Sequence, residues 1–262
     1  MTVLFFQMSL AILLSLEPSQ TWFPFLFAGL AAFLMGLSKA GLKGLSIFNV
    51  TLMALAFGAK SSTGLIMPLL LVGDIFAVIF YGKYTQWRLI LRFLPYMVFG
   101  ILIGVFVGED MPESVFKPVM VSVILLSLGI LIWWDQKKNK SVPKHWSFTG
   151  GLGIVAGICT MMGNLAGAMT NIYFFAMRLP KNEFVGTAAW LFFITNFFKL
   201  PFHIWVWQTI SVETLWIDLK LFPIMVLGLF SGLVLVRKIN EKNYKRFILV
   251  VTAFGALVFL LR

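Results

Sequence analysis

The chain has 262 residues, of which 60% are hydrophobic and 12% are charged. Soluble domains usually contain about 45–50% apolar and about 25% charged residues, and a soluble fold of this size could not bury so much apolar surface. This composition excludes a soluble enzyme and a nucleic-acid-binding module, although the formal net charge is +11. The single cysteine, Cys159, excludes an intrachain disulfide framework and a Cys-based metal cluster. The sequence therefore predicts an all-α polytopic membrane protein.

Apolar stretches near the length of a bilayer core follow one another along the whole chain. They cover residues 2–16, 22–38, 45–58, 64–82, 93–108, 115–134, 146–162, 165–177, 184–207, 219–236 and 246–261. The stretches 45–58 and 165–177 are too short to cross a hydrocarbon core of about 30 Å, because an α-helix rises only about 1.5 Å per residue. We expect residues 1–20 to form an extra, retained N-terminal helix, since they lack the basic region and cleavage site of a signal peptide.

Basic residues are concentrated in four loops, 83–92, 137–144, 178–181 and 237–246, which hold 14 of the 21 Lys and Arg residues. The intervening loops 109–113 and 213–218 are acidic. Under the positive-inside rule the basic loops are cytoplasmic, which places Arg262 outside a bacterial plasma (inner) membrane. Tryptophans near the predicted span ends, including Trp87, Trp205 and Trp207, are expected in the membrane interface.

The two halves of the chain match at two fixed offsets. An offset of 122 pairs Ser38 with Thr160, Gly41 with Gly163, Asn49 with Asn171, Gly64 with Gly186 and Asp74 with Asn196. An offset of 128 pairs Pro95 with Pro223, Gly100 with Gly228, Gly104 with Gly232 and Lys117 with Lys245. The matched loops carry opposite charge, because the basic loop 83–92 corresponds to the acidic loop 206–218. The second half is therefore expected to sit upside down relative to the first.

These features predict two inverted five-segment repeats, residues 21–134 and 146–262, joined by a cytoplasmic linker at 135–145. Inverted repeats whose segments are interrupted are typical of secondary transporters, with the substrate site near the midplane. Glycine is unfavourable in a helix interior, so the clusters at 36–44 and 163–167 predict interrupted or re-entrant helices that meet near the midplane. The alternative for these glycines is close packing of uninterrupted helices.

Several motifs resemble the TauE/SafE (sulfite exporter, TSUP) family of membrane transporters. In the first half these are GLSKAGLKG at 36–44, DIFAVIFY at 74–81, WRL at 87–89 and LP at 94–95, followed by Gly100 and Gly104. In the second half they are RLPK at 178–181, VGT at 185–187 and NFFKLP at 196–201. The resemblance covers nearly everything from Trp22 onward. It implies export or uptake of a small sulfur-containing or carboxylate anion, coupled to ions.

The candidate substrate-binding residues lie at the two predicted interruptions and on one following helix. They are Ser38, Lys39, Gly41, Lys43, Gly44, Asn49, Thr160, Gly163, Asn164, Asn171, Asn196 and Lys199. Free N–H groups and positive helix ends at such interruptions suit an anion. A lysine at the bilayer centre costs about 2.5–3.5 kcal/mol and normally marks a polar cavity. The alternative is that 36–44 is a cytoplasmic turn, where both Lys39 and Lys43 are solvated.

Asp74 is the one acidic residue deep in a predicted span, and it is the candidate proton-coupling residue. Desolvation opposes its charged form, whereas a nearby cation such as Lys199 would favour it. The alternatives are a structural Asp–Lys pair, or a hydrogen bond to a neighbouring helix, with Lys199 extending to the outer interface. His203 is expected to be an interfacial residue rather than a ligand.

The sequence contains no His, Cys and carboxylate cluster for a metal and no P-loop, so neither a cofactor nor ATP-driven transport is expected. The predicted function is that of a secondary transporter, not an enzyme, which moves sulfite, a sulfonate or another small organic anion and is coupled to protons. Its partners are the small anion and the lipid bilayer. Two alternatives are a passive anion channel with the same site and a non-transporting membrane scaffold or assembly factor. The scaffold alternative predicts that the embedded Lys and Asp residues form ion pairs with each other and that no cavity exists.

Overall fold

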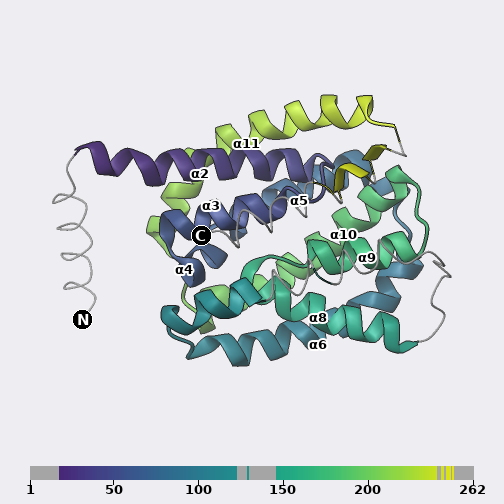
Figure 1. Ribbon diagram of the computed structural model, residues 1–262, viewed down its shortest axis with the longest axis horizontal. Coiled ribbons are helices and arrows are strands. Elements are labelled where there is room, and N and C mark those ends of the chain that lie inside the picture. The colour runs from purple at the N-terminus through teal and green to yellow at the C-terminus, as the bar shows by residue number, and fades with distance from the viewer. Residues whose placement is uncertain are drawn as a thin grey trace.

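The structure, a computed structural model, describes residues 18–122, 129, 146–240, 243–244, 246–248 and 250. The predicted linker 135–145 and almost all of the predicted first and last helices, 1–20 and 246–261, lie outside the described residues. Every element described is helical, which confirms the all-α class. Figure 1 shows the helices as a bundle in which α2 and α11 lie along one side, α6 and α8 along the other, and α5 and α10 between them.

The first half begins with α2 (Pro18–Lys39), α3 (Ser46–Phe57), α4 (Ala59–Leu65), α5 (Met67–Tyr81), the 3₁₀-helix η1 (Gly82–Tyr84) and α6 (Trp87–Glu109), after which residues 113–122 are also helical. The second half contains α8 (Trp146–Gly163), α9 (Gly167–Ala176), α10 (Lys181–Pro201), the π-helix η2 (Phe202–Val206) and α11 (Val212–Lys238). Both segments that were too short to span, 45–58 and 165–177, are indeed the short helices α3 and α9.

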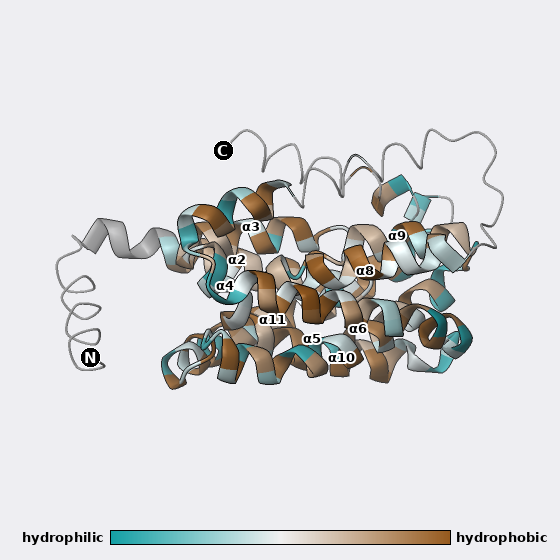
Figure 2. Cartoon of the chain, turned by 90° about the horizontal axis from the view of Figure 1, so that it is seen from below, coloured by the Kyte–Doolittle hydropathy of each residue, from teal (hydrophilic) through white to brown (hydrophobic). Residues whose placement is uncertain are grey.

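Five helical segments in the described part are long and apolar enough to cross a membrane. They are Met67–Tyr84, Trp87–Glu109, Trp146–Gly163, Lys181–Val206 and Val212–Lys238. Figure 2 shows apolar residues along the lengths of the helices and polar residues gathered at the two ends of the bundle. Large side chains such as Phe106, Ile79 and Leu227 are exposed on the outside. An outward apolar surface of this kind suits lipid, so the protein is integral to a membrane.

The predicted span 64–82 is wrong in one respect, because the helix is interrupted at Ile66 and residues 59–65 form the separate helix α4. The chain turns at Gly58, whose φ of +89° favours glycine. The backbone N–H groups of Ala59 and Lys60 then donate to the carboxylate of Glu113. This distant acidic residue acts as the N-terminal cap of α4, a contact that local sequence does not indicate.

Glycines bring α2 against α11 and α6 against α8 in matching ways. A Cβ on Gly36 would lie 2.0 Å from the carbonyl oxygen of Met225, and one on Gly157 would lie 2.1 Å from that of Met97. The two glycines are 121 residues apart in the chain, and the two methionines are 128 residues apart. The predicted pair Gly100 and Gly228 behaves alike, since a Cβ on either would lie 2.1 Å from a carbonyl oxygen of the facing helix.

A similar correspondence links a contact of α4 with a contact of α10. A Cβ on Gly64 would lie 2.0 Å from the Thr209 hydroxyl oxygen, and one on Gly186 would lie 2.4 Å from the carbonyl oxygen of Tyr81. Gly64 and Gly186 are 122 residues apart, and Tyr81 and Thr209 are 128 apart. The predicted offsets therefore relate contacts as well as residue types. Between α2 and α8 the offset is 121 instead of 122.

Contacts between helix ends show which ends of the helices lie together. The end of α3 and the start of α4 contact the end of α6, because the Lys60 ammonium group donates to the carbonyl oxygen of Glu109. The start of α10 contacts the end of α11, where Lys181 donates to the carbonyl oxygens of Val236 and Ile239. In Figure 1, α3 runs back along α2, and α9 runs back along α8 from the other end of the bundle.

Candidate functional site

Two helix interruptions face each other in the middle of the bundle. The first separates α2 from α3 and turns at Gly41 and Gly44, whose φ angles of +121° and +102° favour glycine. The second separates α8 from α9 and turns at Asn164, with φ of +56°. Asparagine is among the few other residues that adopt this conformation readily, so Asn164, not the predicted Gly163, makes the second turn.

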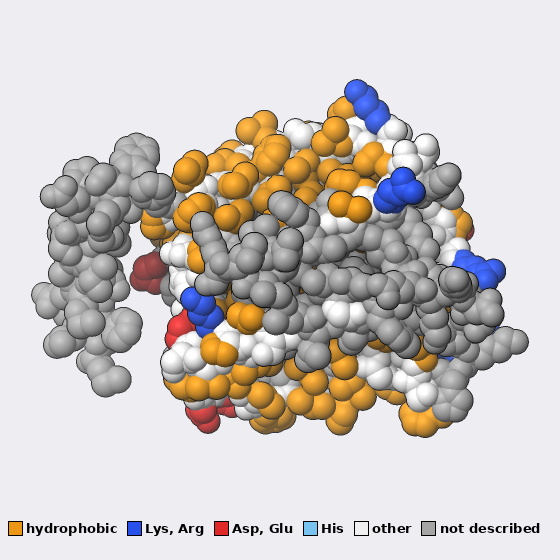
Figure 3. All heavy atoms as spheres, in the orientation of Figure 1, with side chains coloured by type: hydrophobic (Ala, Val, Ile, Leu, Met, Phe, Trp, Pro, Cys, Tyr) orange, Lys and Arg blue, Asp and Glu red, His pale blue; other side chains and the backbone are white. Residues whose placement is uncertain are grey.

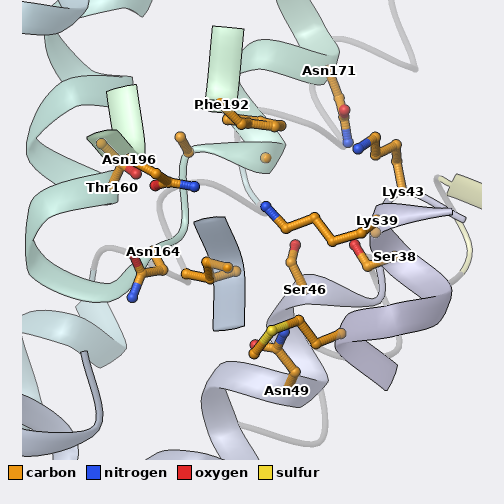
Figure 4. Close-up of a pocket in the computed structure, with 15 residues that line it drawn as sticks. Ser38, Lys39, Lys43, Ser46, Asn49, Thr160, Asn164, Asn171, Phe192 and Asn196 are labelled. Atoms are coloured by element: carbon orange, nitrogen blue, oxygen red, sulfur yellow. The ribbon is translucent and has the colours of Figure 1, made fainter. Parts of the chain in front are cut away.

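A cavity of about 50 Å³ lies between the two interruptions. Nine of the thirteen predicted site residues line it: Ser38, Lys39, Lys43, Gly44, Asn49, Thr160, Asn164, Asn171 and Asn196. Figure 4 shows that the labelled side chains of the wall come from the helices on both sides of the two interruptions and from α10. Since one water needs roughly 10–15 Å³ of such space, the cavity holds about four waters or an anion with a similar number of atoms.

The N-termini of α3 and α9 both open onto this cavity. Ser46 and Gly167, the first residues of these helices, line it, and neither helix has a side-chain cap. The Ser46 hydroxyl oxygen would lie 3.2 Å from a Cβ placed on Gly167, so the two helix ends are in close contact. The first N–H groups of a helix have no intrahelical partner and carry partial positive charge. Two such ends beside one polar cavity favour an anion.

Lys39 and Asp74 form a buried ion pair at the edge of the cavity. The Lys39 ammonium nitrogen lies 2.5 Å from the Asp74 Oδ1 atom, and the Asn196 amide donates to Oδ2 at 2.6 Å. Gly73 permits this approach, because a Cβ there would lie 2.8 Å from the Lys39 side chain. Asp74 does not line the cavity itself but lies behind Lys39 and Asn196.

The predicted partner of Asp74 was Lys199, and that assignment is wrong. Lys199 is fully buried, and its ammonium group donates to the Thr160 carbonyl oxygen, the Thr160 hydroxyl and the Asn164 side-chain oxygen. It holds the end of α8 and the second interruption in place from behind the cavity wall. It also does not extend to the outer interface, because the same three acceptors hold the ammonium group in the interior.

Lys43 is buried at the cavity without a carboxylate partner among the described residues. Its ammonium nitrogen lies 5.5 Å from the ring centre of Phe192, and that of Lys39 lies 5.9 Å from the same centre. These are cation–π distances. The solvated-turn alternative for Lys39 and Lys43 is therefore wrong, since both side chains are buried between helices. Formally, three ammonium groups and one carboxylate leave two positive charges around the cavity.

Two interfacial predictions are also wrong. His203 is buried in the π-helix η2, where its Nδ1 atom lies 2.9 Å from the Thr209 hydroxyl oxygen. Trp207 is buried as well, and its indole N–H donates to the carbonyl oxygen of Val105. Trp87 and Trp205 are exposed, as an interfacial position requires. The two buried residues lie in the chain turn that follows α10, which folds back against α6.

Sequence reasoning missed several residues of the cavity wall and included four that do not line it, namely Gly41, Gly163, Asp74 and Lys199. The missed residues of the wall are Met35, Ser46, Leu70, Ala166, Gly167 and Phe192. Apolar residues on apolar helices give no local signal of a site. Leu70 and Phe192 are counterparts at the offset of 122, so identification of one would have indicated the other.

A membrane-integral helix bundle around a small, buried, positively charged cavity is the architecture of a membrane transport protein. The family model described as sulfite exporter TauE/SafE matches residues 25–259, so the chain belongs to this family of membrane transporters. This result confirms the resemblance and indicates transport of sulfite or a related anion rather than enzymatic catalysis. No curated protein and no solved structure matches the chain.

Proposed function

We propose that the protein is a secondary transporter that moves sulfite, a sulfonate or another small organic anion and binds it in the cavity between the two helix interruptions. One observation carries this proposal: the cavity brings together the uncapped N-termini of α3 and α9 and the buried ammonium groups of Lys39 and Lys43. The cavity volume of about 50 Å³ limits the substrate to a few non-hydrogen atoms. Ser38, Asn49 and Asn171 supply neutral polar groups to orient its oxygens.

Lys43 and Asn49 each have a polar group at the cavity that lacks a partner among the described residues. The Lys43 ammonium group forms no ion pair among the described residues, and the Asn49 side-chain oxygen is buried without a hydrogen-bond partner. A buried polar group without a partner costs about 1–3 kcal/mol, so such groups are usually found where a ligand or water completes them. An anion with a protonated oxygen, or a bridging water, satisfies both groups.

Proton coupling follows from the Lys39–Asp74 pair. An anion that enters the cavity competes with Asp74 for the ammonium group of Lys39. A buried carboxylate that loses its cation is stabilised by taking up a proton. Release of the anion restores the ion pair and expels the proton. In this mechanism Lys39 contacts the substrate, Asp74 carries the proton, and Asn196 positions Asp74 by its hydrogen bond of 2.6 Å.

The arrangement of the cavity supports an inverted repeat as the basis of alternating access. The wall contains four counterpart pairs at the offset of 122, namely Ser38 and Thr160, Gly44 and Ala166, Asn49 and Asn171, and Leu70 and Phe192. The contacts between helix ends support opposite directions of entry for the α2–α3 and α8–α9 pairs. A site beside such an axis is reached equally from both sides when the halves rock against each other.

Lys39 and Asp74 do pair, as a non-transporting scaffold would also require, but such a scaffold would enclose no polar cavity. The cavity between the two interruptions therefore argues against the scaffold. A passive channel with the same site is distinguished by flux. Protein in liposomes is given sulfite, sulfonates or short carboxylates, with and without a pH gradient. We expect uptake of one of these anions against its own gradient when a proton gradient is present. Flux that only dissipates the anion gradient would instead identify a channel.

A further inference from the structure

A second, larger cavity lies at the basic end of the bundle, away from the substrate cavity. Its volume is about 300 Å³, and it is enclosed by the end of α5, by η1, by the start of α10 and by the end of α11. Three basic side chains from these separate elements line it: Lys83, Lys181 and Arg237. Figure 3 shows Lys and Arg side chains gathered toward the end of the molecule where α11 finishes, which is the same end.

The three basic side chains that line the cavity differ in the groups that they contact. The Lys181 ammonium group is fixed by the carbonyl oxygens of Val236 and Ile239 at 3.1 and 2.7 Å. The Lys83 ammonium group lies 5.1 Å from the ring centre of Tyr84, which also lines the cavity. Among the described residues, no acidic side chain forms an ion pair with any of the three. The cavity therefore has an unbalanced positive charge.

Apolar surface adjoins this charged cavity directly. Phe80 and Leu233 belong to its wall, and their neighbours Ile79 and Val234 are 70% and 56% exposed on the outside of the bundle. Ile79 and Val234 lie on helices long and apolar enough to cross the membrane. The cavity thus stands where the lipid-facing surface of α5 and α11 meets the basic end. A ligand with a negative headgroup and acyl chains matches both parts.

We propose that this cavity binds the phosphate headgroup of an anionic phospholipid, with the acyl chains lying against Ile79 and Val234. Basic pockets between transmembrane helices are known to suit such headgroups, and each Lys or Arg near an anionic membrane surface contributes roughly fivefold in affinity. A free phosphate ester shares the headgroup chemistry but gains nothing from the apolar surface. The lipid is therefore the favoured ligand.

Lipid binding is measured by native mass spectrometry on the full chain in neutral detergent, titrated with phosphatidylglycerol or phosphatidylcholine. We expect one saturable phosphatidylglycerol site that phosphatidylcholine does not fill. The double variant Lys83→Gln/Arg237→Gln should weaken this site by about 25-fold. The matched control Arg88→Gln/Lys238→Gln removes the same charge from exposed positions outside the cavity and should keep the site.

A second variant, Asn182→Trp, fills the mouth of the cavity without a change of charge and should also abolish the saturable site. Equal thermal stability of all variants in phosphatidylcholine shows that they are folded. The proposal is overturned if phosphatidylglycerol binding is not saturable, or if the control pair weakens it as much as the cavity pair. It is also overturned if glycerol 1-phosphate displaces the lipid at comparable concentration, because the site then recognises a soluble phosphate.

Discussion

Asp74 on α5 and Asn196 on α10 are joined by a hydrogen bond of 2.6 Å, although they are 122 residues apart. They are also counterparts at the predicted repeat offset of 122. In the proposed inverted repeat, two equivalent residues can touch only if both lie beside the two-fold axis that relates the halves. The two halves differ at this point by a single group, a carboxylate in one and an amide in the other. This one difference confines the buried negative charge to α5, where Lys39 reaches it.

Replacement of the Asp74 carboxylate is expected to separate substrate binding from proton coupling. Asp74→Asn keeps the shape and a hydrogen bond to the neighbouring helix, but it cannot exchange a proton. We expect the variant to bind the anion and to lose the response of liposome flux to a pH gradient. Asp218→Asn, which changes another buried carboxylate away from the cavity, is the matched control and should retain the response. Undiminished pH dependence in Asp74→Asn means that the proton is carried elsewhere.

The ammonium group of Lys43 is expected to contribute to affinity without supporting the fold, because no described carboxylate depends on it. Hydrogen bonds to charged groups contribute about 1.5–3 kcal/mol, so Lys43→Gln should weaken anion binding roughly 10- to 150-fold. Binding is measured by titration calorimetry with sulfite in detergent. Lys117→Gln removes one exposed positive charge and serves as the control. An affinity equal to that of the control would place Lys43 outside the binding site.

Lys39 should behave differently, because its removal leaves Asp74 buried without its cation. Breaking one partner of a buried ion pair costs about 3–5 kcal/mol, so Lys39→Ala should unfold at markedly lower denaturant concentration than the wild type. The double variant Lys39→Ala/Asp74→Asn removes both charges and should recover most of that loss. Denaturant unfolding followed by tryptophan fluorescence measures both. If the double variant is as unstable as the single one, the two residues are not energetically coupled.

The helix contacts at Gly36 and Gly157 predict two equivalent packing defects. An added methyl group at either position would overlap a backbone carbonyl oxygen of the facing helix, at 2.0 Å and 2.1 Å. Gly36→Ala and Gly157→Ala should each lower stability by about 1–3 kcal/mol, since the backbone must move. Gly151→Ala, where a methyl group meets nothing within 4 Å, is the control. Thermal unfolding in detergent reports all three, and tolerance of both substitutions would contradict the close packing.

The charge distribution predicts opposite accessibility for two exposed lysines. Lys117 lies after the acidic loop 109–113, and Lys238 lies in the basic loop 237–246, at opposite ends of the bundle. In a Cys159→Ser background, Lys117→Cys should react with a membrane-impermeant maleimide applied to intact cells, whereas Lys238→Cys should react only after the cells are broken. Labelling of both from outside would contradict the assigned orientation.

Local pattern was sufficient for most of the helices and for the location of the two interruptions, although it missed the separate helix α4 and the turn at Asn164. The short helices α3 and α9 follow from apolar stretches of limited length. The repeat also placed Ser38, Asn49, Thr160 and Asn171 at one level, and all four line the same cavity. These predictions succeeded because they depend on composition, on helix periodicity and on spacing within the chain, which the sequence contains directly.

The sequence by itself determined the membrane class, the separation of basic and acidic ends and the residues at the interruptions. Only the tertiary structure decided which charges meet. Lys39 and Lys199 both lie within reach of the membrane interior, and spacing favoured Lys199 for Asp74, yet the ion pair is with Lys39 at 2.5 Å. Such a choice depends on helix rotation and on space between backbones, here the absence of a Cβ at Gly73. An electrostatic contact changes strongly over a few ångströms, and no pattern along one chain specifies distances of that size between separate helices.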